Sequence, residues 1–352
     1  MQWLLGAAQA VKEVVPRGTF EVAGRRIQQQ KLLADGGFAY VYSGLDADSG
    51  ERLAIRRVLL QDQEAIAKAK VEIDLLGSLC DHPHIVHFQG AQIFARGAGS
   101  SEAVYIFELC PGGTLLSHLE TAVESRARKD VPYCCPCLEE KDILEVLGAT
   151  AQALVYLTRL GMIHYDVKSE NLLLGNDGLW KLGDFGSASE RTFDLEGADK
   201  KALLEAQEFI HGRCTPMYRC ILFAMMTGQH PFPMESTCGN ITASYRLPAE
   251  ARESYSQAVL FWLQTLLARQ PSERPTAAKL AHDVERYRLL GEEPQEAVPT
   301  QVPATAAVPA AQPAEGAWQA DFAAFAPLPE EPKPGRGGEE AKSLGEGSES
   351  QK

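Results

Sequence analysis

The 352-residue sequence predicts an α+β fold with a β-rich first part, a helical second part and a C-terminal tail that does not fold. Strand-type runs separated by turn residues fill the region before residue 110, whereas helical spacing of apolar residues dominates from Lys141 onward. Segment 291–352 holds 9 of the 20 prolines and too few large apolar residues to offset chain entropy. We therefore expect one folded region followed by a disordered tail.

The first part is predicted to be an antiparallel meander interrupted by one helix. Its strands are predicted within 26–44 (two strands joined by Gly36 and Gly37), at 53–60, at His84–Phe88 and at Val104–Leu109. Between the third and fourth strands, segment 62–79 has apolar residues at three- and four-residue spacing, which is typical of one helical face. The glycines and proline at 111–113 then end this pattern.

The second part is predicted to be mainly helical. Amphipathic helices are expected at Lys141–Leu160, Ser256–Arg269 and Ala277–Arg288. Two short apolar runs, Leu172–Leu174 and Leu179–Leu182, flank a turn of Asn, Asp and Gly and predict a β-hairpin.

Composition excludes several classes of protein. The net charge of −13 argues against a general nucleic-acid binder, because phosphate contacts need clustered positive charge. No run reaches the ~18 unbroken apolar residues that a membrane-spanning helix needs. The eight cysteines form no regular framework, which favours reduced thiols and a cytoplasmic protein.

The stretch 163–186, IHYDVKSENLLLGNDGLWKLGDFG, holds the polar residues most informative about function. Phosphoryl transfer needs oxygen ligands for Mg²⁺, a carboxylate that orients the attacking hydroxyl and accepts its proton, and a cation that offsets phosphoryl charge. Asn171 and Asp184 fit the metal ligands. Asp166 fits the catalytic base and Lys168 the cation.

With these residues at these spacings, the sequence from about Ile27 to Arg288 resembles a eukaryotic protein kinase. It resembles the serine/threonine type, because Lys168 stands two residues after Asp166. The resemblance implies a two-lobed protein-kinase-like fold that uses ATP and Mg²⁺. It divides the chain into an N-terminal extension (1–26), an N-lobe with hinge (27–110), a C-lobe (111–290) and the tail (291–352).

Three segments narrow the resemblance. The loop LADGGFAYV at 33–41, DFGSAS at 184–189 and TPMYR at 215–219 are similar to the Numb-associated kinase family, which includes the adaptor-associated and cyclin-G-associated kinases. This resemblance implies phosphorylation of protein Ser and Thr, notably on clathrin-adaptor subunits, and a place in endocytic traffic. A cytoplasmic protein that is peripheral on endocytic membranes would fit that role.

The resemblance also implies which residues bind ATP. Val41, Ala54 and Leu173 would enclose the adenine ring. The backbone of Glu108 and Cys110 in the hinge would hydrogen-bond its edge, and Phe107 would be the gatekeeper residue. The complete set expected to bind ATP is Ala34, Gly36, Gly37, Val41, Ala54, Arg56, Glu72, Glu108, Cys110 and Leu173. The resemblance also implies a stacked apolar column that includes Leu76, His164 and Phe185.

Two substitutions depart from the family pattern. Arg56 replaces the lysine of the third strand, sixteen residues before Glu72, and its wider, planar group should position the phosphates less well. Tyr165 replaces the arginine of the catalytic loop, so control by a phosphorylated activation loop is not expected.

The third departure is an apparent deletion between Arg219 and Cys220. TPMYR runs directly into a segment that resembles the interior of a large buried helix, and the Ala-Pro-Glu motif with a connecting helix is missing. Arg274, in SERP, would thereby lose its usual carboxylate partner. The junction is equally compatible with a skipped exon, a gene-model error or an evolved deletion.

These departures keep a second hypothesis open: a pseudokinase that binds partners with weak or no transfer activity. In the tail, Trp318, Asp321, Phe322 and Phe325 resemble Phe-based motifs presented to clathrin adaptors, with unspecific apolar residues as the alternative. The cluster of Cys134, Cys135 and Cys137 is expected to be a loop rather than a zinc site, because no further pair of ligands completes it.

Overall fold

The computed structural model describes residues 19–35, 39–97, 100–127, 136–190, 220–231, 245–268 and 273–294. The chain divides into two compact units, Met1–Thr305 and Ala306–Lys352, and all described residues belong to the first. Several predictions concern residues outside the described ranges: the Gly36-Gly37 turn, Cys134 and Cys135, segment 215–219, and the tail from residue 295 onward with its aromatic cluster at 318–325.

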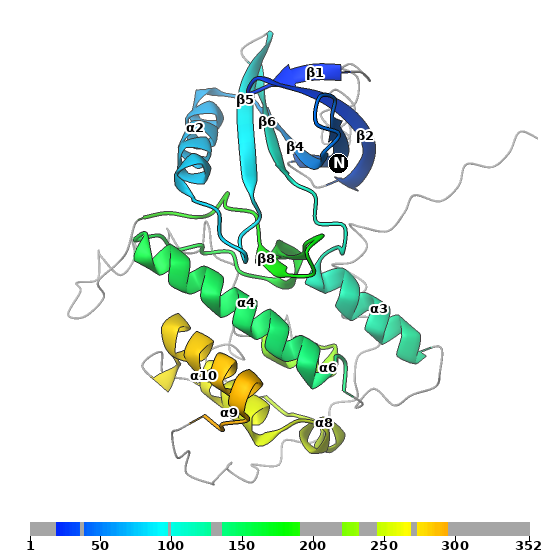
Figure 1. Cartoon of the computed structure of the whole chain (residues 1–352), viewed down its shortest axis with the longest axis vertical. Coiled ribbons are helices and arrows are strands. Elements are labelled where there is room, and N and C mark those ends of the chain that lie inside the picture. The colour runs from blue at the N-terminus through cyan, green and yellow to red at the C-terminus, as the bar shows by residue number, and fades with distance from the viewer. Residues whose placement is uncertain are drawn as a thin grey trace, which may run out of the picture. The chain divides into compact units, whose positions relative to one another are not determined.

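Six antiparallel strands form one sheet in the order β1-β2-β3-β4-β6-β5 (Figure 1). They are β1 (Thr19–Val22), β2 (Arg25–Asp35), β3 (Ala39–Asp46), β4 (Arg52–Leu60), β5 (Phe88–Gly97) and β6 (Ser100–Glu108). The predicted meander is confirmed for β2, β3, β4 and β6, while the four-residue β1 is too short to show an alternating pattern in sequence.

The predicted helix is also present as α2 (Gln63–Ser78), which lies beside the sheet in Figure 1. It begins after Asp62, whose carboxylate accepts a hydrogen bond from the Ala65 amide at 2.8 Å. This N-cap satisfies one of the amides that have no partner inside the helix.

The prediction of a strand at His84–Phe88 is wrong, because β5 begins only at Phe88. The residues before Phe88 pair with another partner. The Val86 amide donates to the Leu182 carbonyl, and the Leu182 amide donates to the His84 carbonyl, both at 2.9 Å. This segment therefore connects the sheet to the helical part instead of extending a strand.

One face of the sheet buries an ion pair within an apolar cluster that includes Ile27, Ile55 and Ile106. Arg57 donates from Nε and Nη2 to Glu102 Oε1 at 2.8 and 2.6 Å, and both side chains are almost fully buried. Neighbouring residues of a strand face opposite sides, so Arg57 lies on the face away from Arg56.

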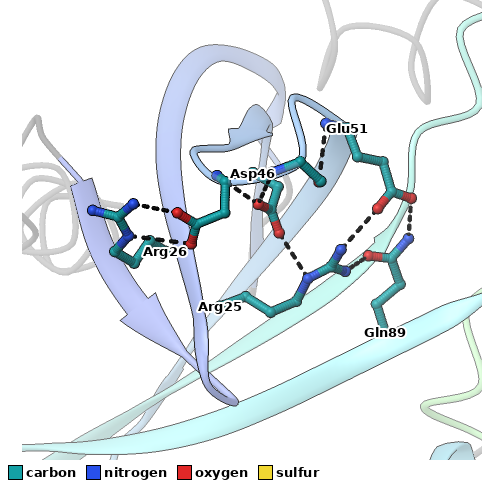
Figure 2. A network of polar contacts seen from close by, with 7 residues as sticks. Arg25, Arg26, Asp46, Glu51 and Gln89 are labelled. Atoms are coloured by element: carbon teal, nitrogen blue, oxygen red, sulfur yellow. Dashed lines mark hydrogen bonds and ion pairs between the residues drawn. The ribbon is translucent and has the colours of Figure 1, made fainter.

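A polar network ties the turns of the sheet together (Figure 2). Arg25 donates to Asp46 and Glu51, each at 2.8 Å, and also to Gln89 on β5. Asp46 accepts from two amides of its own turn at 2.9 Å, and these backbone hydrogen bonds lower its pKa. The network joins the start of β2, the β3–β4 turn and β5, which is a structural role.

The described residues of the helical part form six α-helices, one 3₁₀ turn and a two-stranded hairpin. The helices are α3 (Leu115–Ala127), α4 (Glu140–Arg159), α6 (Ile221–Thr227), α8 (Ala249–Ser254), α9 (Gln257–Leu266) and α10 (Ala277–Leu290). The 3₁₀ turn is η1 (Ser169–Asn171), and the hairpin strands are β7 (Leu172–Leu174) and β8 (Trp180–Leu182). The predicted hairpin and the helices α4, α9 and α10 are confirmed; α3 and α8 were not predicted. The sequence of α3 is largely polar and buries only Leu115 and Leu119, which explains its weak signal.

The short helix α6 follows the apparent deletion between Arg219 and Cys220 and is nearly completely buried. Its last turn is anchored to the chain before α4. The amides of Cys137 and Leu138 donate to the carbonyls of Met226 and Met225 at 2.8 and 2.9 Å. The Tyr255 hydroxyl lies 3.2 Å from the Met226 carbonyl and 2.8 Å from the Leu138 carbonyl, so carbonyls at the end of α6 have partners outside the helix.

None of the helices in the described part of the chain is long and apolar enough to cross a membrane. Its four cysteines, Cys80, Cys110, Cys137 and Cys220, are free thiols. Within the same residues no group of three or more His, Cys, Asp or Glu side chains is arranged to hold a metal.

Candidate active site

The predicted catalytic residues of the loop between α4 and β7 are brought together. Lys168 Nζ lies 2.9 Å from Asp166 Oδ2, and Asn171 Nδ2 donates to the same oxygen at 3.1 Å and to the Asp166 carbonyl at 2.8 Å. Burial acts to lower the pKa of Lys168, but the neighbouring carboxylates of Asp166, Glu170 and Asp184 together outweigh it, so the pKa is raised and the amine stays charged. Two donors thus hold a largely buried carboxylate in one orientation.

His164 fixes this loop to the strand that follows the hairpin. Its Nε2 lies 3.0 Å from the Gly183 carbonyl, and the Asp166 amide donates to Nδ1 at 3.3 Å. These partners assign the proton to Nε2 of a neutral imidazole. The ring also meets Phe185 edge-on, with centroids 4.8 Å apart, so two members of the predicted apolar column are in contact.

We expect the stability contribution of His164 to be lost on acidification. Burial lowers its pKa, so across the window below the unfolded value of ~6.5 the folded protein binds fewer protons than the unfolded chain. The contribution is complete above that pH and falls as the pH falls through the window. Chemical unfolding at pH 7.5 and 5.5 should show a smaller loss of stability for His164→Asn than for the wild type. Equal losses in the two proteins would contradict this role.

Arg56 links α2 to the segment after β8. Its Nη2 pairs with Glu72 Oε1 and its Nη1 lies 3.1 Å from Asp184 Oδ1. Burial acts to lower the pKa of Arg56, but the two carboxylates outweigh it and the pKa lies above its ordinary value. The expected Arg56–Glu72 pair is therefore present in the structure. The additional contact with Asp184 was not predicted.

Tyr105, which no sequence pattern indicated, completes this group. Its hydroxyl donates to Glu72 Oε2 at 2.9 Å, and its ring centroid lies 4.2 Å from the guanidinium carbon of Arg56. Tyr105 is the cross-strand partner of Arg56 in the β4–β6 ladder. Only this pairing, which depends on strand register, would have identified it.

Of the residues expected around an adenine ring, Val41 and Ala54 lie on the same face of the six-stranded sheet as Arg56, whereas Leu173 belongs to the separate β7–β8 hairpin. Val41 pairs with Arg56 across β3 and β4, and Ala54 pairs with Phe107 across β4 and β6. Ala34, before the glycine loop, pairs with Val41. Leu173 is the central residue of β7 and forms a bridge with Thr114, just beyond the hinge.

Existing hydrogen bonds of the hinge backbone limit which of its groups could bind the edge of a purine. The Glu108 amide donates to the His87 carbonyl at 3.0 Å, so Glu108 would have its carbonyl left to accept a hydrogen bond from a purine. The Cys110 carbonyl accepts from the Gly113 amide at 3.3 Å, so Cys110 would contribute its amide. Burial raises the pKa of the Cys110 thiol to about 12, which keeps it protonated.

A second residue that sequence analysis missed is Lys181 on β8, beneath the hinge. Its Nζ binds both carboxylate oxygens of Glu108, at 3.0 and 2.8 Å, and Asp177 Oδ2 at 2.9 Å. Lysine is rarely buried without a carboxylate. The available sequence signal was the position of Lys181 between two large apolar residues, Trp180 and Leu182, in a predicted strand.

Asn171 and Asp184 fit the ligand set of a hard divalent cation. Asn171 donates through Nδ2 to Asp166, which leaves Oδ1 as the amide atom able to bind a metal. The side chain of Asp184 is 49% exposed, and Arg56 and Gly186 both approach it through Oδ1. Carboxylate and amide oxygens are ligands that Mg²⁺ accepts.

Two of the residues that bear on the departures from the family pattern, Tyr165 and Arg274, lie in the described part of the chain. Tyr165 has a φ of 63°, a left-handed conformation that is uncommon for residues other than glycine, and Asp184 shares this conformation with a φ of 55°. Arg274 is half-buried, and its Nε donates to the Ala268 carbonyl at 2.9 Å. A backbone carbonyl after α9 thus accepts one of its hydrogen bonds, while the expected loss of the usual carboxylate partner stays a prediction.

Comparison with known proteins finds similarity to protein kinases. Residues 27–213 match the family model described as protein kinase domain. Serine/threonine-protein kinase 16 of Mus musculus is 26% identical over 300 residues, which cover 77% of this chain and 93% of that protein.

Other relatives are longer than this chain. Serine/threonine-protein kinase ppk30 of Schizosaccharomyces pombe is 26% identical over 288 residues, covering 74% of this chain and 28% of that protein. Actin-regulating kinase PRK1 of Saccharomyces cerevisiae is 26% identical over 288 residues, covering 73% of this chain and 34% of that protein. The chain spans about a quarter to a third of the first curated relatives it matches.

Proposed function

This chain belongs to the protein kinase family, and from that premise we propose that it transfers the γ-phosphoryl group of ATP to serine and threonine side chains of proteins. The observation that carries the proposal is the hydrogen-bonded set of Asp166, Lys168 and Asn171. A carboxylate held by a cation and an amide is suited to orient a substrate hydroxyl.

Asp166 orients the substrate hydroxyl and accepts its proton as the new oxygen–phosphorus bond forms and the bond to the β-phosphate oxygen breaks. Lys168, whose charge is maintained mainly by Asp166, offsets the negative charge of the group in transfer. Asn171 and Asp184 would hold Mg²⁺, which neutralises phosphate charge when bound. Arg56 contributes positive charge on the nucleotide side, and Glu72 fixes its position.

The remaining residues would position the nucleotide. Val41, Ala54 and Leu173 would enclose the adenine. The Glu108 carbonyl would accept a hydrogen bond from its edge, and the Cys110 amide would donate one to it. Ala34, with the Gly36-Gly37 turn, would cover the phosphates.

Acceptor preference tests this proposal. With ATP and Mg²⁺, the purified chain should phosphorylate peptides that differ only in a Ser, Thr or Tyr acceptor, with a clear preference for Ser and Thr. Phosphoamino-acid analysis by mass spectrometry identifies the product. Phosphorylation of tyrosine alone, or of none of the three while the chain is folded, would reject the proposal.

The alternative is a pseudokinase that binds partners without transfer. The contact between Arg56 and Asp184 favours it, because a cation already occupies one oxygen of a proposed metal ligand. Exchange of Arg56 for lysine separates the two functions. A large gain in transfer indicates an enzyme weakened by this arginine, whereas no transfer in either protein favours the scaffold.

The place of action is a finer proposal and rests on the Numb-associated resemblance. Protein substrates in clathrin-adaptor complexes, reached through Trp318, Asp321, Phe322 and Phe325, would place the chain in the cytoplasm and peripherally on endocytic membranes. A pull-down with purified adaptor ear domains tests this, because alanine at Phe322 and Phe325 should abolish binding if the cluster is the motif.

A further inference from the structure

The side chain of Arg56 is buried in an environment that its two carboxylate partners satisfy only in part. Its Nη1 and Nη2 pair with Asp184 and Glu72, but Nε is buried without a hydrogen-bond partner among the described residues. A buried, unpaired donor is costly unless another group stabilises the charge.

The ring of Tyr105 supplies that stabilisation. The guanidinium carbon lies 4.2 Å from the centroid of this ring, and the Phe107 centroid is the next aromatic face at 5.8 Å. A planar guanidinium stacks on aromatic faces, whereas the compact ammonium of lysine offers no such plane. The ring therefore favours arginine at position 56.

The ring of Tyr105 is itself held in place. It stacks on Phe107 at 6.3 Å with the planes 10° apart, and Phe107 packs against Phe88 at 5.5 Å. Tyr105 and Phe107 come from β6, and Phe88 opens β5. We call these three side chains the aromatic shelf.

The hydroxyl of Tyr105 adds a second restraint, because it donates to Glu72 Oε2 while Arg56 takes Oε1. One carboxylate thus serves the arginine and the tyrosine at once, with a separate oxygen for each. Burial raises the pKa of Tyr105, so the hydroxyl keeps its proton and remains a donor.

We propose that Tyr105 is a positioning residue that lets an arginine work at position 56, by supporting the guanidinium on the aromatic shelf and fixing Glu72. This inference rests on the proposed nucleotide-binding function. Tyr105 contacts Arg56, Glu72 and Phe107. It acts through Arg56, whose Nη1 is directed to Asp184 at the proposed metal site.

A double-mutant cycle tests the inference in the full chain. Binding of a fluorescent ATP analogue with Mg²⁺ is measured for the wild type, Tyr105→Leu, Arg56→Lys and the double variant. Tyr105→Leu should weaken binding about tenfold when residue 56 is arginine, since it loses a desolvated cation–π contact and a hydrogen bond to a charged group. With lysine at 56, the same change should alter binding by less than about twofold.

Tyr105→Phe provides the conservative comparison, because it keeps the ring and loses only the hydroxyl. It should weaken binding by about threefold, between the wild type and Tyr105→Leu. Thermal unfolding of each variant without nucleotide identifies changes that merely damage the fold.

The outcomes separate this inference from the function on which it rests. An equal loss of affinity with arginine and with lysine at position 56, or a lower melting temperature with unchanged affinity, would mean that Tyr105 is an ordinary core residue. If the wild type binds no nucleotide, the proposed function itself falls, and the role of Tyr105 falls with it.

Discussion

Replacing Asp166 by asparagine is expected to reduce phosphoryl transfer by roughly 10²- to 10⁴-fold, the usual contribution of a positioned general base. Asparagine keeps the size of the side chain and can still accept hydrogen bonds from Lys168 and Asn171. It cannot accept the proton of the attacking hydroxyl. Nucleotide affinity should stay within about twofold of the wild type, because the proposed adenine and metal ligands are unchanged.

The measurement is the rate of transfer to a serine peptide at saturating ATP, together with the dissociation constant of the nucleotide. Asp48→Asn is a matched control, because it removes the same charge from an exposed pair with Arg26 in the β3–β4 turn. Its rate should equal that of the wild type. Full activity in the Asp166→Asn chain would remove Asp166 from the mechanism.

The largest expected loss of stability follows from replacing Glu102 by glutamine. Arg57 and Glu102 are 2% and 3% exposed, and Arg96 also pairs with Glu102. Removing the carboxylate leaves the buried Arg57 guanidinium without its counter-charge, which typically costs about 3–5 kcal/mol. The melting temperature should fall by on the order of 10 °C.

Thermal and chemical unfolding of the purified chains measure this change. Asp48→Asn again serves as the control, because both members of its ion pair are exposed and its unfolding midpoint should not move. Burial lowers the pKa of Arg57, which is consistent with a charge that depends on its partner. A Glu102→Gln protein as stable as the wild type would show that this pair contributes nothing net.

The parts of the site that sequence predicts are those set by local spacing. Asp166, Lys168 and Asn171 lie within one short loop, so their motif already contains most of their geometry. The role of position 56 is also predictable from sequence, because Arg56 takes the place of the third-strand lysine in the family pattern, sixteen residues before Glu72.

What sequence analysis missed depends on register and on long-range contacts. Tyr105 meets Arg56 only because β4 and β6 pair in one register, and a shift by one residue would turn its side chain to the other face. Lys181 and Glu108 are far apart in sequence and meet beneath the hinge. The misplaced strand at His84–Phe88 has the same cause, since its backbone is paired by β8 rather than by the sheet.

The most direct test of the central claim is the transfer of labelled γ-phosphate from ATP to a serine peptide by the full chain. The Asp166→Asn chain, purified in parallel, provides the blank. The account predicts Mg²⁺-dependent transfer by the wild type well above this blank. Transfer that does not exceed the blank, from a folded chain that binds ATP, would contradict it and establish the scaffold as the better description.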